Sequence, residues 1–271
     1  MVFLLRGRLS VIALALHTLY FITSTSAARA DTHRIKWHDT GKGSIAIEEA
    51  WTIPESSSKV GGGAAAIAEL NDNLFNIYDQ RLTRMDANDM VLSCASPCIQ
   101  GMSDPAAAEA MAINVNNQLA AQIYNESSHP NITGRFGAFA AVSMHNATSA
   151  AVELRRAVQE LGFLGALVND YQQTNGKYGS TMYSGTQSPS SMFQFTSTLR
   201  TNVAPISTLF YSQVPWLRGP SQEFSVTLST HVLGLCTNGV FDRFPTLKVI
   251  VGHMGERIPS DLDRIDKVRT T

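Results

Sequence analysis

Short apolar runs alternate with longer amphipathic stretches along most of this chain. Five runs, mostly apolar throughout, predict buried strands at 44–47, 90–93, 136–143, 165–168 and 247–251. Apolar positions at helical spacing predict helices over 67–86, 104–124, 148–161 and 223–241 and from 259 onward, with a short helix over 189–199. Strands that lack polar alternation and are separated by helices are typical of a parallel sheet covered by helices.

Polar side chains stand at the ends of three of these predicted strands. Glu48 follows the first strand, Asn169 follows the fourth, and His253 follows the last. In parallel folds, chemistry gathers at the carboxyl ends of the strands. These three positions are therefore the first candidates for a functional site.

Glu48 is the first of two adjacent carboxylates, and Glu49 is the second. A carboxylate at the mouth of a barrel is a reasonable ligand for a divalent metal, and a surface ion pair is an equally open alternative. Successive side chains of a strand point to opposite faces, so only one of the two can point into the barrel.

His253 lies between two glycines, Gly252 and Gly255, which permit a close approach of the backbone. A histidine at this position can serve as a general acid or base or as a metal ligand. Glu256 follows three residues later, close enough to orient the imidazole if a helix begins there. The alternative is a capping or core histidine, and the strand-end position favours function over it.

Three other histidines carry weaker signals. His145 precedes Asn146 and is expected in a helix-capping turn. His231 falls inside a predicted helix, where we expect it to be packed or exposed instead of catalytic, and His129 falls in a loop. None of the three is a candidate for chemistry.

The composition is that of an ordinary globular protein. The chain has 271 residues, of which 44% are hydrophobic and 16% are charged, and its formal net charge is −1. This length and balance predict one domain with a sizeable core. A nucleic-acid surface would need a basic stripe, which this charge balance does not favour.

The first 30 residues differ from the rest. Arg6 and Arg8 precede an apolar run over 9–22, and small residues follow up to Ala30. This is the pattern of a secretory signal peptide, and the run is short for a membrane span. An uncleaved anchor and a misplaced gene start remain as alternatives.

Sequons and cysteines point in different directions on location. Sequons begin at Asn125, Asn131 and Asn146 and agree weakly with secretion. An odd count of three cysteines, Cys94, Cys98 and Cys236, is not a disulfide framework. We expect buried or unpaired thiols, and no structural zinc site.

A family resemblance rests on five segments in a fixed order. They are IAIEEAW at 45–51, FGAFA at 136–140, GALVND at 165–170, LCTNGVFDRFP at 235–245 and VGHMGE at 251–256. Together they resemble the fungal dihydroxybenzoate decarboxylases, which belong to the amidohydrolase-related group that includes aminocarboxymuconate-semialdehyde decarboxylase. The resemblance covers roughly residues 44–266.

The resemblance implies a (β/α)8 barrel with one divalent metal, zinc or manganese, at the strand ends. It implies non-oxidative removal of carbon dioxide from a hydroxylated aromatic carboxylic acid, with the metal as Lewis acid and template. By position, Glu48 matches a metal ligand, His253 the active-site histidine and Glu256 its acidic partner, while Asn169 matches a residue of the substrate pocket.

Departures from the family pattern concern the metal ligands. Many relatives have a histidine where this chain has Ala50, although the dihydroxybenzoate branch does not. The His-Pro motif of the fifth strand is missing, because 195–199 runs directly into 200–205, and the aspartate of the eighth strand would lie beyond Thr271. We therefore expect an incomplete TIM-type barrel that lacks about strand 5 and strands 7 and 8, with a metal bound weakly or not at all. A gene-model error, a decayed gene and a non-catalytic descendant would each explain the pattern.

The sequence thus predicts three regions: a leader at 1–30, a loose lead-in at 31–43 and a partial barrel domain at 44–271. The predicted function is that of a carboxy-lyase that acts on a small aromatic acid and is impaired in this chain. We expect no nucleic-acid partner, and no association with a membrane once the leader is removed. A non-catalytic fragment and a hydrolase of the same superfamily are the alternatives. A homo-oligomer and a cytoplasmic instead of a secreted location also stay open.

Overall fold

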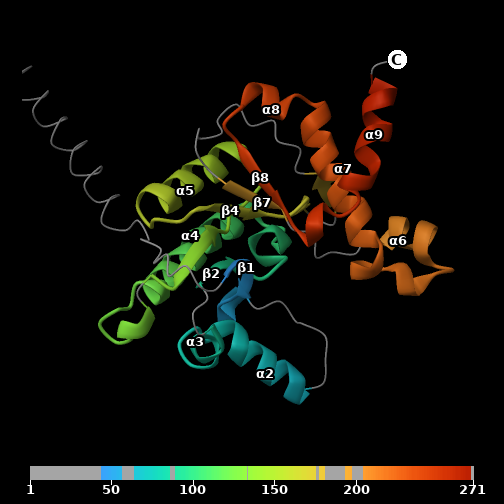
Figure 1. Ribbon diagram of the computed structural model, residues 1–271. Helices are drawn as coiled ribbons and strands as arrows, with labels where there is room; N and C mark the ends of the chain where they lie inside the picture. The colour runs from blue at the N-terminus through green and yellow to red at the C-terminus, as the bar shows by residue number, and fades with distance from the viewer. Residues whose placement is uncertain are drawn as a thin grey trace, which may run out of the picture.

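The computed structural model describes residues 44–56, 64–85, 89–132, 134–174, 177–180, 193–196 and 204–269. A six-stranded parallel sheet forms the centre of this part of the chain (Figure 1). Its strands, in spatial order, are β1 (Ile45–Trp51), β2 (Asp89–Cys94), β3 (Phe136–Ala140), β4 (Gly165–Val168), β7 (Phe193–Thr196) and β8 (Lys248–Val251). The predicted parallel α/β architecture is confirmed.

The strand β7 corrects one sequence prediction. A short helix was expected over 189–199, but residues 193–196 pair in parallel with β4 on one side and β8 on the other. Each residue of β4 has a partner in β7, from Gly165 opposite Phe193 to Val168 opposite Thr196. Four residues are too few for periodicity to separate a strand from a helix, and pairing with two neighbours decides between them. A strand therefore occupies the place next to β4, although it carries no His-Pro motif.

The helices are α2 (Ala64–Phe75), α3 (Gln80–Met85), α4 (Pro105–Ile123), α5 (Ala147–Gln159), α6 (Ala204–Tyr211), α7 (Glu223–Thr237), α8 (Val240–Arg243) and α9 (Ile258–Arg269). Two of the predicted helices are each divided in two. The side chain of Asn76 accepts hydrogen bonds from the backbone N–H groups of Tyr78 and Asp79, which separates α2 from α3. Gly239, with φ of 66°, separates α7 from α8.

Short elements complete the chain between these helices and strands. The strands β5 (Tyr171–Thr174) and β6 (Lys177–Ser180) form an antiparallel hairpin directly after β4, which the sequence did not predict. Short 3-10 turns include η2 (Cys98–Gly101) after β2 and η6 (His253–Gly255) after β8. Both of these turns lie at the carboxyl ends of parallel strands.

The sheet has a different apolar cluster on each face. The larger cluster includes Leu92 of β2 with Val115 and Leu119 of α4, so it fills the space between the sheet and its helices. The smaller cluster consists of strand residues, Val91, Phe139 and Leu167, with Leu164 and Ile250 packed against it. We call the face that carries the smaller cluster the inner face of the sheet.

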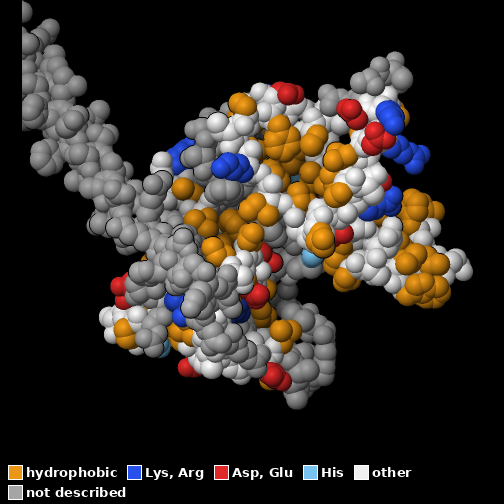
Figure 2. All heavy atoms as spheres, in the orientation of Figure 1, with side chains coloured by type: hydrophobic (Ala, Val, Ile, Leu, Met, Phe, Trp, Pro, Cys, Tyr) orange, Lys and Arg blue, Asp and Glu red, His pale blue; other side chains and the backbone are white. Residues whose placement is uncertain are grey.

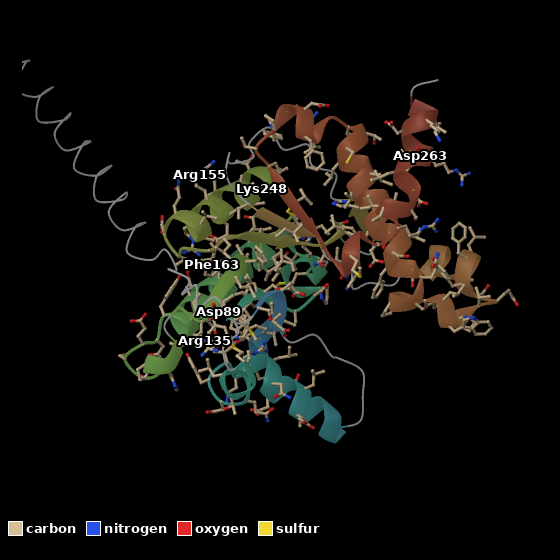
Figure 3. The ribbon with its side chains drawn as sticks, viewed as in Figure 1. Asp89, Arg135, Arg155, Phe163, Lys248 and Asp263 are labelled. Atoms are coloured by element: carbon tan, nitrogen blue, oxygen red, sulfur yellow. A yellow bond between two sulfur atoms is a disulfide. The ribbon has the colours of Figure 1, made fainter. Side chains whose placement is uncertain are left out.

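The amino ends of the strands are held by an ion pair. Asp89 begins β2 and Arg135 directly precedes β3, and their side chains approach to 3.4 Å (Figure 3). At the opposite ends of the strands, Asn169 directly follows β4 and His253 lies just after β8. The first strand was expected to end before Glu48, but β1 continues to Trp51, so Glu48 lies within it. No helix in the described part of the chain is long and apolar enough to cross a membrane.

Apolar side chains also reach the surface. Figure 2 shows them gathered at the α6 region, where Leu209, Phe210 and Trp216 are each at least 66% exposed. Met254, next to the candidate histidine, is 97% exposed. These residues are exceptions to the burial of large apolar side chains in the remainder of the described fold.

Candidate active site

A β-bulge in β1 determines which of the two adjacent glutamates faces the inner side of the sheet. Ala46 pairs with Met90 and Glu49 pairs with Leu92, so β1 has one residue more than β2 between these pairs. Since Met90 and Leu92 both belong to the helix-facing cluster, Glu49 also faces the helices, and Glu48 takes the inner face. Without the extra residue, strand alternation would place Glu48 on the same side as Ala46.

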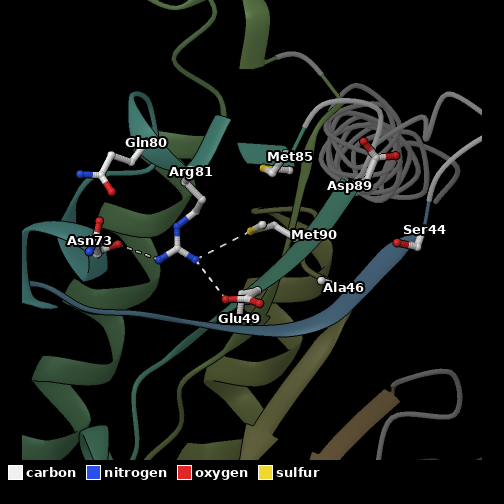
Figure 4. Close-up of a pocket in the computed structure, with 9 residues that line it drawn as sticks. All are labelled: Ser44, Ala46, Glu49, Asn73, Gln80, Arg81, Met85, Asp89 and Met90. Atoms are coloured by element: carbon white, nitrogen blue, oxygen red, sulfur yellow. Dashed lines mark hydrogen bonds and ion pairs between the residues drawn. The ribbon is translucent and has the colours of Figure 1, made fainter. Parts of the chain in front are cut away.

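Glu49 forms an ion pair with Arg81 outside the site, as Figure 4 shows. Its carboxylate lies 3.6 Å from the guanidinium of Arg81, which also donates hydrogen bonds to the carbonyl oxygens of Ala50 and Asn73. Glu49, Arg81 and Asn73 line a pocket of about 420 Å³ on the helix-facing side of β1, and neither Glu48 nor His253 lines it. The prediction that only one of the two glutamates can point into the barrel is confirmed.

Glu48 receives a hydrogen bond from the hydroxyl of Ser93, a fully buried residue of β2. Burial raises the pKa of Glu48 above its ordinary value, and the negative charge of Glu49 adds to this effect. The hydrogen bond from Ser93 and the nearby charge of His253 act in the opposite direction and lower that pKa. The structure therefore brings Glu48 and His253 within electrostatic range of each other, although they are far apart in the sequence.

His253 and Glu256 form a close pair at the carboxyl end of β8. The Nδ1 atom of His253 lies 2.6 Å from a carboxylate oxygen of Glu256, and the histidine side chain is 50% exposed. The expected contact between Glu256 and this imidazole is present, although no helix begins there, since α9 begins at Ile258. The orienting role of Glu256 stays a prediction. The carboxylate accepts a hydrogen bond from the N–H group at Nδ1. Nε2 is therefore the ring nitrogen that can exchange a proton with another group.

The backbone at this pair is unusual. His253, Met254, Gly255 and Glu256 all have positive φ, between 51° and 81°. For a residue other than glycine this conformation costs about 1 kcal/mol or more. Such strain collects at functional sites, where the surrounding structure holds it in place, so it supports a functional role for this turn.

Asn169 lies at the end of β4 and is 1% exposed. Its backbone N–H donates to Gln100 over 2.6 Å, and its side-chain oxygen accepts a hydrogen bond from the hydroxyl of Ser96. The side-chain amide donates weakly to the carbonyl of Pro97, over 3.4 Å. These contacts attach Asn169 to the loop that follows β2. Its predicted contact with substrate stays a prediction.

Sequence reasoning missed two buried glutamines that join the loops at this edge. Gln100 donates to the carbonyl oxygens of Asn169 and Tyr171. Gln172 donates to the carbonyl of Met102 and accepts from the backbone N–H of Met144. The loops after β2, β3 and β4 are thus joined by side-chain amides, and no motif in the sequence signals such contacts.

The cysteines also differ from expectation. Cys94 and Cys98 form a disulfide between the last residue of β2 and the first residue of η2, so the prediction of unpaired thiols is wrong for these two. Their Cα atoms lie 5.8 Å apart, because the chain turns back immediately after the strand. A covalent bond therefore fixes the beginning of the loop after β2, and Gln100 follows two residues after Cys98.

Three other histidines lie in the described part of the chain, each in a different environment. His145 lies beside the N-cap Asn146, as expected, and its Nε2 atom lies 2.9 Å from the carbonyl of Met102. The ring of His129 stacks on Tyr78 with centroids 3.7 Å apart. His231 is packed within α7 at 7% exposure.

A divalent metal needs three or more protein ligands in most sites of this kind. Among the described residues, no group of three or more histidine, cysteine, aspartate or glutamate side chains lies close enough together to hold one. Glu48 is half-buried and accepts a hydrogen bond from Ser93, and His253 is paired with Glu256. The described residues therefore do not fit a metal on their own.

Comparisons with known proteins show the family to which the chain belongs. The family model for amidohydrolases matches residues 97–269. The gamma-resorcylate decarboxylase of Polaromonas is 34% identical over 83% of this chain and 70% of its own length. The decarboxylase orsB of Emericella nidulans is 34% identical over 74% of this chain and 60% of its own length.

Solved structures are similar over the same part of the chain. A 2,6-dihydroxybenzoate decarboxylase in complex with 2,6-dihydroxybenzoate has a TM-score of 0.71 and 33% identity, covering 83% of this chain and 71% of its own. A dihydroxybenzoic acid decarboxylase from Polaromonas, solved with manganese and the inhibitor 2-nitroresorcinol, has a TM-score of 0.69 and 32% identity, over 83% of this chain and 69% of its own. The α/β fold with a parallel, partial-barrel sheet is confirmed.

Proposed function

The chain belongs to the amidohydrolase family, and on that premise we propose that it is a carboxy-lyase for a hydroxylated aromatic carboxylic acid. The observation that carries the proposal is the strand-end pair of His253 and Glu256, 2.6 Å apart and within electrostatic range of Glu48. Two relatives that are 34% identical over most of this chain are decarboxylases, one of them named for gamma-resorcylate. A similar solved structure is that of a 2,6-dihydroxybenzoate decarboxylase.

His253 is the proposed proton carrier. Decarboxylation without a redox step adds a proton to the ring carbon that bears the carboxylate, after which the carbon–carbon bond breaks and carbon dioxide leaves. Glu256 holds Nδ1, so Nε2 delivers the proton, which stays on the product carbon, and Nε2 then takes a new proton from solvent. The half-exposed side chain lets a substrate approach. Glu256 acts as a positioning residue through the histidine.

Glu48 and Asn169 have separate proposed roles. By family position Glu48 is a metal ligand, but the described residues do not complete a ligand set, so no step of this proposal passes through a metal. Asn169 is proposed to shape the substrate pocket. Its attachment to the loop after β2 fixes the carboxyl end of β4 relative to that loop.

The test is carbon dioxide release by the purified chain from 2,6-dihydroxybenzoate and 2,3-dihydroxybenzoate, with and without added manganese or zinc. In heavy water the product should carry deuterium at the carbon that lost the carboxylate. Replacing His253→Gln should lower the rate about 100-fold or more, because general acid catalysis contributes that much. His129→Gln is the matched control, since His129 stacks on Tyr78 outside the proposed site. Absence of carbon dioxide from every phenolic acid, with metal bound, would contradict the proposal.

A second candidate is a non-catalytic protein that binds aromatic acids. The absence of a three-ligand group among the described residues favours it. Titration calorimetry with 2,6-dihydroxybenzoate separates the two candidates. Binding that is lost in His253→Gln, without carbon dioxide release in any metal condition, would support the second candidate over the first.

We also propose that residues 1–30 are a leader, that 31–43 connect it to the domain at 44–271, and that the chain enters the secretory pathway. The pattern of the first 30 residues supports this, and so does the disulfide between Cys94 and Cys98, because disulfides persist mainly in oxidising compartments. The cysteines, which by their number alone argued against secretion, now support it.

A further inference from the structure

We infer that Asn146 is a site of N-linked glycosylation. The inference rests on the secretory part of the proposed function and is independent of the proposed catalysis. Asn146-Ala147-Thr148 is a sequon, and all three residues are exposed. A sequon alone is a weak signal because the pattern also arises by chance. The conformation of Asn146 gives the independent argument.

The two ends of the Asn146 side-chain amide have different environments. The oxygen caps α5, because it accepts hydrogen bonds from the backbone N–H groups of Thr148 at 2.9 Å and Ser149 at 3.2 Å. The nitrogen makes no hydrogen bond with the described residues. Because a glycan attaches to the nitrogen, the cap that starts α5 is retained in the modified protein.

Glycosylation changes the bonds of the side-chain nitrogen and leaves those of the oxygen. A bond forms between Nδ2 of Asn146 and the anomeric carbon of a lipid-diphosphate-linked oligosaccharide. The bond from that carbon to the diphosphate breaks, the lipid diphosphate leaves, and the amide loses one proton. The amide oxygen takes no part in the new bond and stays available to the helix.

The other two sequons differ from this one. Asn125 is half-buried, and its side-chain oxygen accepts a longer bond of 3.4 Å from the hydroxyl of Ser127. The sequon at Asn131 includes Thr133, which lies outside the described residues. Asn146 is therefore the position where exposure and side-chain geometry both favour a glycan.

The position of Asn146 has a consequence for the candidate site. Helix α5 begins where β3 has ended, and all six strands of the sheet are parallel. A glycan at its first turn therefore lies at the carboxyl ends of the strands, as His253 does. Next to it, His145 contacts the carbonyl of Met102, so the glycan would lie beside the joined loops at the rim of that site.

The experiment expresses the full chain in a yeast that glycosylates secreted proteins, once with its own first 30 residues and once with a strong foreign signal peptide. Total cell material and medium are both collected, so a protein retained inside the cell is also counted. Peptides are treated with a glycan-releasing amidase in heavy-oxygen water, which marks each glycosylated asparagine by its mass. We expect the mark at position 146 in both arms.

Two variants separate the sugar from the cap. Asn146→Asp keeps an oxygen cap but removes the acceptor nitrogen, and Thr148→Ala removes the sequon but leaves Asn146 in place. Both should lose the glycan, and Asn146→Asp should keep the melting temperature of the unglycosylated protein. An unmarked Asn146 in the arm with the foreign signal would overturn the inference. A mark in that arm alone would support the site and overturn the proposed leader.

Discussion

At the scale of single residues, His231 is an unusual buried group. It lies in α7 at 7% exposure, and its Nε2 atom has no hydrogen-bond partner among the described residues. Burial lowers the pKa of His231 to about 4, because the charged imidazolium loses its hydration there. The folded protein therefore keeps this ring neutral at pH values where an unfolded chain would protonate it.

This difference predicts a loss of stability in acid. Between about pH 6.5 and 4 the unfolded state binds a proton that the folded state does not, so the free energy of unfolding falls by about 3 kcal/mol as the pH decreases. Urea denaturation at several pH values measures the slope. His231→Met, of similar size and without a titrating group, should flatten the curve in this window. An unchanged slope in the variant would show that other groups cause the acid sensitivity.

Gln100 is the second residue whose importance the structure reveals. It is 2% exposed and makes hydrogen bonds to the backbone of Asn169 and Tyr171 from a loop far away in the sequence. We expect Gln100→Ala to lower the free energy of unfolding by about 2–3 kcal/mol, since several buried hydrogen bonds are lost together. Equilibrium denaturation measures this change.

Two further variants test that explanation. Gln118→Ala on α4 removes a glutamine whose side-chain amide, among the residues that the structure describes, bonds only to exposed Asn114. This variant should change stability by about 0.5 kcal/mol or less. Gln100→Glu keeps an acceptor for the N–H of Asn169 but loses the donors, so it should also destabilise. A loss in Gln100→Ala no larger than in Gln118→Ala would mean that the loops are held by other contacts.

At the scale of elements, the break between α7 and α8 depends on one glycine. Gly239 has φ of 66°, and a Cβ atom placed there would lie 3.3 Å from a carboxylate oxygen of Asp242. Gly239→Ala should therefore destabilise the protein by about 1 kcal/mol. Gly234→Ala, inside α7, should have the opposite sign, with a gain of up to about 1 kcal/mol from helix propensity. Thermal unfolding of the two variants measures both changes in stability. If both variants are stabilised, or both destabilised, Gly239 does not have the special role proposed for it between α7 and α8.

Apolar patterning predicted the elements that bury one continuous face. The strands ending near Asn169 and His253 and the capped helices α4 and α5 follow directly from it. The start of β1 follows as well, although this strand extends beyond Glu48 to Trp51. The sequence did not reveal β7, because its four residues gain their conformation from neighbours on both sides. The same reason explains the missed contacts of Gln100 and Gln172, which depend on tertiary distance alone.

The candidate site was predictable in part. The end of the last strand identified His253, and the spacing of three residues identified Glu256 as its partner. Glu48 was chosen because it follows a predicted strand, but the structure places it within β1. Alternation alone could not choose between Glu48 and Glu49, because a bulge of one residue reverses the alternation along β1. Ser93, which contacts Glu48, gave no signal, since a serine within an apolar strand has many structural roles.

At the scale of the whole molecule, the sheet ends at β1 and β8 in the described part of the chain. Ile45 and Ile47 of β1 are 53% and 50% exposed, so this edge combines apolar side chains with strand backbone. Such an edge favours pairing with another chain. We expect the purified protein to associate as its concentration rises, which light scattering measures.

A charge at this edge should suppress that association, because a lysine on an edge strand must lose its hydration before another strand can pair there. Ile45→Lys should therefore raise the monomer fraction at a given concentration. Val152→Lys is the matched control, since Val152 is 58% exposed but lies on the helix α5 and not on a strand edge. If both variants raise the monomer fraction equally, general surface charge is the cause. If neither does, association proceeds through another surface, and the exposed apolar residues of the α6 region, Leu209, Phe210 and Trp216, are the next to replace.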